Sequence, residues 1–201
     1  MTEGLVQHPD ELGRCWWCGT DPLYVAYHDT EWGVPERDGR ALFEKLILDG
    51  FQAGLSWITI LRKRDNFRSA FANFDPVAIA EFGPDRVEAL MADAGIVRNR
   101  AKIVGTIASA RAYVEGGGPD AFARLLWDRF DGEPLQTARV ARADIPTADA
   151  VSRAISADLK ARGYAFCGPT IVYAFLQACG LINDHLVGCH RHAACRDLGR
   201  P

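Results

Sequence analysis

Hydrophobic residues recur at helical spacing along most of the chain. After Asp38, a residue type that caps helices well, four apolar residues fall on one helical face: Ala41, Leu42, Leu46 and Ile47. A second helical run covers residues 55–71, beyond a break at residues 51–54. No segment shows the convincing alternation of apolar and polar residues that marks a strand, so the pattern predicts a helical protein.

Proline and glycine positions set the predicted helix boundaries. Asp75-Pro76 forms an N-cap followed by a proline at the first helical position, and Pro84-Asp85 opens the next helix. Gly95 is expected to end that helix in a left-handed conformation. After a short turn, Gly95–Arg98, helix is expected to resume over residues 102–114.

Two breaks interrupt the second half of the chain, at residues 116–119 and 131–134, where glycine and proline are concentrated. Beyond them, helices are expected near residues 148–161 and 169–179. The predicted fold class is therefore all-α.

Length and composition fit one globular domain over residues 1–201, built as two helical lobes. Hydrophobic residues make up 48% of the chain, which is enough for a core. Residues 1–12 and 193–201 are expected to be loose tails. The first segment lacks a secretory signal pattern, and no stretch approaches the roughly 18 apolar residues of a membrane span. We therefore expect a soluble, cytoplasmic protein with no membrane partner.

Charge gives no general indication of a nucleic-acid partner, because the net charge is −3. Basic residues nevertheless cluster at Arg62–Arg64 and at Arg98–Lys102. Such clusters are usually solvated helix faces, and some bind phosphates. The turn Gly95–Arg98 could present backbone N–H groups and a helix N-terminus to a phosphate, or it could be an ordinary helical hairpin.

The cysteines indicate a metal site more than disulfides, because four of the six lie near the two ends of the chain together with histidines. One possible ligand set is Cys15, His28, His185 and Cys189. A rival set combines Cys15 and Cys18 with two of Cys189, His190, His192 and Cys195. Spacing alone slightly favours the rival, since Cys-x2-Cys is the commoner zinc pattern.

Aromatic residues are dense between residues 16 and 57, where four of the five tryptophans lie. The group comprises Trp16, Trp17, Tyr24, Tyr27, Trp32 and Trp57. Such residues often form plain core, but with a nearby carboxylate they could enclose a flat or cationic ligand. Asp49 is that carboxylate. It is placed near a helix C-terminus, where the helix dipole disfavours an acid, so another use is expected for it.

Taken together, these segments resemble the 3-methyladenine DNA glycosylase I family. The most specific stretches are Tyr-His-Asp-Thr-Glu-Trp-Gly at 27–33 and Gln-Ala-Gly-Leu-Ser-Trp at 52–57. Others are Asp-Ala-Gly-Ile at 93–96 and Asn-Asp-His at 183–185. The resemblance covers roughly residues 14 to 190.

The resemblance implies a helix–hairpin–helix glycosylase fold in which the hairpin is Gly95–Arg98. It also implies a structural zinc ion that joins the N- and C-terminal segments, held by Cys15, His28, His185 and Cys189 in preference to the set with Cys18. The base pocket maps onto Trp17, Tyr24, Tyr27 and Trp57, with Asp49 as the acidic, catalytic residue.

The function that the resemblance implies is base excision repair. A monomeric DNA-3-methyladenine glycosylase would flip the damaged base out of alkylated double-stranded DNA. It would hydrolyse the N-glycosidic bond and release free 3-methyladenine without a lyase step. DNA contacts are expected from Gly95, Arg98 and Lys102 of the hairpin, with Leu55 as a wedge in the base stack.

Two departures keep other functions open. The family's usual glutamate is Asp49 here, which reaches one methylene less, and Phe51 follows where a small or polar residue is usual. A first alternative is a non-catalytic binder of alkylated DNA with an altered pocket. A second is a zinc-stapled helical interaction module with no DNA role.

Overall fold

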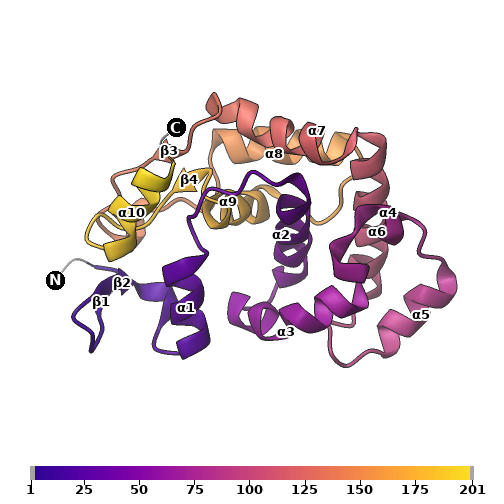
Figure 1. Ribbon diagram of the computed structural model, residues 1–201, viewed down its shortest axis with the longest axis horizontal. Coiled ribbons are helices and arrows are strands. Elements are labelled where there is room, and N and C mark those ends of the chain that lie inside the picture. Colours follow the sequence, from indigo (N-terminus) through magenta and orange to yellow (C-terminus); the bar gives the residue numbers. More distant parts are fainter. Residues whose placement is uncertain (1–2, 200–201) are drawn as a thin grey trace.

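Helices dominate the computed structural model, which describes residues 3–199 (Figure 1). The α-helices are α1 Pro22–Thr30, α2 Gly39–Gln52, α3 Trp57–Ala70, α4 Pro76–Ala80, α5 Pro84–Ala92, α6 Arg100–Glu115, α7 Gly118–Trp127, α8 Ala150–Ala161, α9 Pro169–Ala178 and α10 His190–Leu198. The strands are short: β1 Leu5–Gln7, β2 Gly13–Cys15, β3 Leu135–Gln136 and β4 Ile182–Asn183. The expectation of a helical fold is confirmed.

The predicted caps form as expected. The carboxylate of Asp38 accepts a hydrogen bond from the N–H of Ala41 at 2.7 Å, and that of Asp75 accepts one from Val77 at 3.0 Å. Each satisfies a backbone donor that the first helical turn leaves free. Three helices, α1, α7 and α10, were not among the predicted elements. The second begins at Gly118, inside an expected break, because Pro119 can occupy the first turn.

Gly95 does not take the left-handed conformation that the sequence predicted. Helix α5 ends at Ala92, and the φ angle of Gly95 lies outside the left-handed range. Its N–H instead donates to the carboxylate of Asp93 at 2.7 Å. A Cβ atom at this position would lie 2.9 Å from that same oxygen and 3.2 Å from the Cβ of Asn66. Close approach, not backbone conformation, is the reason for a glycine here.

The two expected tails contain regular structure. β1 pairs with β2 in an antiparallel hairpin that leads directly into Cys15. At the other end, α10 continues through Leu198, and Cys195 on this helix is buried. Figure 1 shows this hairpin, α1 and α10 gathered at one end of the molecule, with α4, α5 and α6 at the other. Residues 1, 2, 200 and 201 lie outside the described residues.

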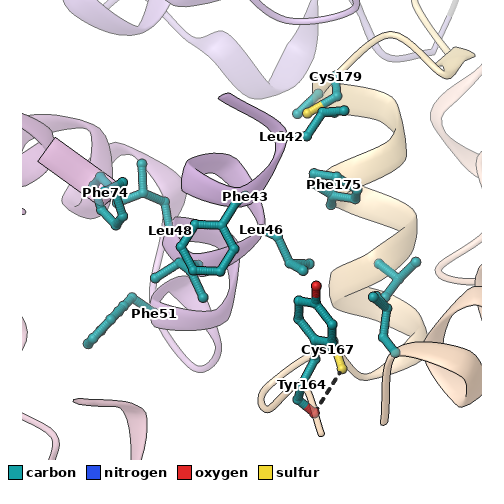
Figure 2. Close-up of a cluster of buried hydrophobic side chains, with 14 of the residues drawn as sticks. Leu42, Phe43, Leu46, Leu48, Phe51, Phe74, Tyr164, Cys167, Phe175 and Cys179 are labelled. Atoms are coloured by element: carbon teal, nitrogen blue, oxygen red, sulfur yellow. Dashed lines mark hydrogen bonds between the residues drawn. The ribbon is translucent and has the colours of Figure 1, made fainter. Parts of the chain in front are cut away.

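Helix α2 is the centre of the core and packs against α3, α6, α7 and α9. Figure 2 shows Leu46 pointing from α2 toward Phe175 of α9, whereas Leu48 and Phe51 lie on the other side of α2, toward Phe74. These side chains are at most 2% exposed. Because α2 is covered on several faces, its last turn, which carries Asp49, is held in place by the whole core.

A glycine turn fixes the segment before α2 against the end of α9. Gly180 has φ +68°, and a Cβ there would lie 2.5 Å from the nitrogen of Pro35. Nearby, the N–H groups of Gly33 and Glu36 donate to the carbonyls of Ala178 and Cys179. The turn therefore needs glycine for two reasons, the left-handed conformation and the absence of a side chain.

Replacing Gly180 by alanine should destabilise the fold more than the same change at Gly132. Gly132 has φ +77° and open space where a Cβ would lie. Gly132→Ala should therefore cost only the left-handed penalty, roughly 1–2 kcal/mol. Gly180→Ala should cost roughly 1–3 kcal/mol more, because the new methyl group overlaps backbone atoms. Denaturant unfolding of both variants measures the difference, and equal losses would contradict the assigned contact.

Candidate functional site

A cavity of about 200 Å³ lies where the 3-10 turn Trp16–Cys18 and α1 meet the α2–α3 corner and α9. Its wall includes all five residues predicted for the pocket: Trp17, Tyr24, Tyr27, Asp49 and Trp57. The structure thus brings together residues that are up to 40 positions apart in the sequence. The remaining wall residues are Trp16, Trp32, Lys45, Gln52, Ile145, Ala174, Gln177 and Ala178.

The aromatic walls are formed by rings that contact one another at an angle. The ring centroids of Trp17 and Tyr24 are 5.2 Å apart, and those of Tyr27 and Trp57 are 5.4 Å apart. Trp17 also meets Tyr27 edge to face at 6.3 Å. Tyr27 and Trp57 are buried, while Trp17 and Tyr24 are half-buried. Such walls offer π faces to a flat or cationic ligand.

The pocket acid is deeply buried and incompletely hydrogen-bonded. Asp49 is 1% exposed, and its Oδ1 accepts a hydrogen bond from the ammonium of Lys45 at 2.5 Å. Its Oδ2 has no hydrogen-bond partner among the described residues, and neither has the Nε1 donor of Trp57. Buried polar atoms are rarely left unpaired. One free acceptor and one free donor in the same wall therefore indicate a polar ligand.

Burial raises the pKa of the Asp49 carboxyl above its ordinary value, and the charge of Lys45 opposes that rise. The ammonium also lies over the ring of Trp57, 3.9 Å from the ring centroid. Lys45 was not among the predicted site residues. The signal that could have revealed it is its spacing, since residues i and i+4 face each other on a helix and Lys45 precedes Asp49 by four.

Volume alone would not have selected this pocket. A hollow of about 370 Å³ lies between α6 and α7, but its described wall contains no aromatic cage around a buried acid. Another, of about 300 Å³, adjoins the pocket and shares four wall residues with it: Tyr27, Lys45, Trp57 and Ala178. We call this neighbour the outer cavity.

A second cluster joins the two ends of the chain. Cys15, His28, His185 and Cys189 are all buried, and their ligand atoms lie within 4.8 Å of one another. The Sγ of Cys189 is 3.4 Å from Nε2 of His28 and 3.5 Å from Nδ1 of His185. A sulfur and a nitrogen bound to one tetrahedral zinc ion would be about 3.6 Å apart. The four side chains are therefore spaced to hold a metal ion.

The other nitrogen of each histidine ring also has a partner. Nδ1 of His28 lies 2.7 Å from Asp29, and Nε2 of His185 lies 3.0 Å from the carbonyl of Trp32. Such partners orient metal-binding histidines. The rival set does not come together: the thiol of Cys18 donates to the carbonyl of Cys15, and His192 contacts the carbonyl of Thr137.

The predicted DNA contacts lie in two neighbouring places. Leu55 is 44% exposed at the α2–α3 corner, and Arg98 is exposed in the turn before α6. Lys102 is only 7% exposed, and its ammonium donates to the carbonyls of Phe51 and Ala53. It therefore ties α6 to the α2–α3 corner, and its contact with phosphate stays a prediction. Among the described helices, none is long and apolar enough to cross a membrane.

Comparison with known proteins identifies close relatives over nearly the whole chain. DNA-3-methyladenine glycosylase 1 of Escherichia coli is 51% identical over 181 residues, which cover 89% of this chain and 96% of the relative. A crystal structure of 3-methyladenine DNA glycosylase I matches with a TM-score of 0.86 and 49% identity, covering 89% of this chain and 99% of the other.

The structure of 3-methyladenine DNA glycosylase I from Staphylococcus aureus, which was solved to explain 3-methyladenine recognition, matches with a TM-score of 0.82. It is 36% identical and covers 86% of this chain and 93% of its own. The family described as methyladenine glycosylase matches residues 17–192, a span that contains most of the pocket wall and three of the four clustered metal-ligand candidates. The chain belongs to the methyladenine glycosylase family.

Proposed function

We propose that this protein is a DNA-3-methyladenine glycosylase that hydrolyses the N-glycosidic bond of 3-methyladenine in alkylated double-stranded DNA. The observation that carries the proposal is the pocket itself, a buried carboxylate with a free acceptor oxygen inside an aromatic cage. The names of the close relatives support the same activity. Because the target atom is inaccessible inside a duplex, the nucleotide must be flipped out of the stack to reach the cavity.

Cleavage of the glycosidic bond needs little catalysis once the methylated base has been recognised. Methylation at N3 leaves the adenine ring cationic, so the bond between the sugar and N9 is already weakened and the base departs as a neutral molecule. A strong general acid is therefore unnecessary. Aromatic faces attract the cation by about 2 kcal/mol when it is desolvated. Interactions that favour the charged, methylated ring over normal adenine provide selectivity.

Asp49 is the proposed base reader. Its Oδ2, which lacks a partner, would accept a hydrogen bond from the exocyclic amine of the base, and its charge would favour the cationic ring. We propose a monofunctional enzyme with no lyase step.

The buried cluster is proposed to hold a structural zinc ion. Two cysteines and two histidines fill a tetrahedral shell and leave no position for a reacting water molecule. The hydrogen bond from Cys15, with those from the two histidines, lowers the pKa of the Cys189 thiol well below its ordinary value. The site thus favours Cys189 as a thiolate, the form that binds zinc, whereas its hydrogen bond with Cys189 raises the pKa of the Cys15 thiol. When bound, the ion would clamp the two ends of the chain and take no part in the reaction.

The DNA-binding face is proposed to combine the α2–α3 corner with the helix–hairpin–helix element formed by α5, the turn and α6. Leu55 would fill the gap left by the flipped nucleotide. Phosphates would be contacted by Arg98, the backbone around Gly95 and the N-terminus of α6. Lys102 would lie on the same face, between the corner and the hairpin. We propose that the protein acts as a monomeric, single-domain enzyme in the cytoplasm, where its six cysteines stay reduced.

Asp49→Asn should lower the rate of 3-methyladenine excision by about tenfold or more, because the amide lacks the charge that favours a cationic base. Affinity for undamaged duplex DNA should hardly change. Asp49→Glu keeps the charge and should retain more activity. Release of free base from methylated DNA under single-turnover conditions is the measurement. Tight binding of alkylated DNA with no release by the unmodified protein would instead support the non-catalytic alternative.

Cys15→Ser should remove the metal, whereas Cys18→Ser should not. Both thiols are buried, and Cys18 makes only hydrogen bonds to carbonyls, which serine can also make. Elemental analysis should give about one zinc per chain for the unmodified protein and for Cys18→Ser. Cys15→Ser should lose zinc, thermal stability and soluble yield. Dependence of the metal on Cys18 would show that the ligand set is wrong.

Affinity for undamaged DNA should be weak and only moderately sensitive to salt, because the chain is net acidic. Each contacted phosphate contributes about −0.9 to the slope of log affinity against log salt, so a slope of about −2 to −5 is expected. Arg98→Ala should reduce the size of that slope by about one. Arg124→Ala removes the same charge from an exposed position on α7 and should leave the slope unchanged. The reverse result would place the DNA elsewhere.

A further inference from the structure

We propose that the side chain of Lys45 takes the place of the cationic base while the pocket is empty. Its ammonium occupies the cation position of the pocket in the free protein, and a cationic base displaces it into the outer cavity. This inference rests on the proposed function, since it names how the same pocket distinguishes a charged base from a neutral one.

The first observation is the position of the ammonium. Nζ of Lys45 lies 2.5 Å from the Asp49 carboxylate and 3.9 Å from the centroid of the Trp57 ring. An ion pair and a π face are the two interactions that a positively charged purine would seek in this pocket. The lysine already makes both. Because like charges repel strongly at short distance in a poorly polarisable interior, lysine and substrate cannot share this position without a large cost.

The second observation is that Lys45 is one of the four residues shared by two adjoining cavities. It lines both the pocket and the outer cavity, and its side chain remains 16% exposed. Three glutamates also line the outer cavity: Glu31, Glu36 and Glu44. The first and third pair with Arg64 and Arg68. Glu36 accepts the N–H of Asp38 and has no basic partner in the described part of the chain.

The outer cavity is therefore a suitable place for a displaced ammonium. Its volume of about 300 Å³ is adjacent to the pocket, and at least one of its carboxylates lacks a counter-ion among residues 3–199. A lysine side chain has four rotatable bonds and can change rotamer without movement of the main chain. Displacement requires no refolding of α2.

This exchange makes binding depend on charge. When a cationic base replaces the ammonium, Asp49 exchanges one counter-ion for another and stays paired. When neutral adenine takes the same place, the displaced ammonium leaves a buried carboxylate without a counter-ion, which is strongly unfavourable. After the glycosidic bond breaks, the base is neutral, so the ammonium can return to Asp49 and help to expel the product.

The test uses two ligands of the same shape and different charge. One is the 3,9-dimethyladeninium ion, a fixed cation whose N9 methyl group replaces the sugar. The other is its uncharged analogue, in which carbon replaces N3. Lys45→Met keeps the length of the side chain and removes its charge. Both ligands should bind this variant more tightly than the unmodified protein, by about tenfold or more, because neither has to break the Lys45–Asp49 pair. Calorimetry or quenching of tryptophan fluorescence measures both affinities.

Arg40→Met is the matched control. It removes one positive charge from the same helix, α2, but Arg40 is exposed, donates to the carbonyl of Asn73 and lines neither cavity. Both affinities should stay within about twofold of those of the unmodified protein, since an exposed charge contributes little. Equal gains for Arg40→Met and Lys45→Met would show a general charge effect and overturn the proposal.

Two other results would also overturn it. A gain for the cation alone would mean that Lys45 stays beside the bound base and merely repels it. No gain for either ligand would mean that the ammonium does not occupy the base position. Failure of the proposed function looks different, because the unmodified protein would then bind neither ligand and release no base from methylated DNA.

Thermal unfolding distinguishes displacement from a loss of structure. Free Lys45→Met should melt at a lower temperature than the unmodified protein, because Asp49 loses its counter-ion. The cationic ligand should restore that ion pair and raise the melting temperature by more than it does for the unmodified protein. Should Lys45→Met be insoluble, Lys45→Gln offers a neutral hydrogen-bond donor to Asp49 and should show gains of the same sign.

Discussion

The junction of the two chain ends at the Cys/His cluster is the constraint on which the pocket depends. Residues of the cluster and of the pocket lie side by side on the same elements: Cys15 directly precedes the turn with Trp17, and His28 follows Tyr27 on α1. The rings of Trp17 and His28 are 5.2 Å apart. Whatever fixes the cluster therefore also fixes one aromatic wall, because a ligand cannot shift without moving its neighbour.

The opposite wall depends on a different contact. The last turn of α2 leaves carbonyl groups without helical partners, and Lys102 donates to those of Phe51 and Ala53. A cation is favourable at this negative end of the helix. The α2–α3 corner, which presents Leu55 to solvent and Trp57 to the pocket, is thus held by the helix that follows the hairpin. The proposed base pocket and the proposed DNA-binding face are therefore joined through the contacts of Lys102.

Patterns among residues close together in the sequence predicted much of the fold and less of the site. Caps such as Asp38 and Asp75 depend on neighbouring residues alone, so they were predictable. The candidate metal ligands were not, because spacing favoured Cys18, and only the family resemblance pointed to the set that the fold assembles. Lys102 was predicted to contact DNA, and nothing in its local sequence indicated that its ammonium would be buried under the α2–α3 corner. Lys45 was missed because a Lys–Asp pair one turn apart is usually an unremarkable surface feature.

The position of the cluster at the two ends of the chain also determines when the pocket can form during translation. Cys15 and His28 are synthesised early, and His185 and Cys189 near the end. The contacts of α1 within the Cys/His cluster therefore cannot form until most of the chain has been translated. The central helices can pack as they emerge, since α2 and α3 follow each other closely. The half of the pocket on α1 cannot be completed until the chain is nearly finished. A truncated product would therefore carry the proposed DNA-binding hairpin without a finished aromatic cage, which would separate binding of DNA from excision of the base.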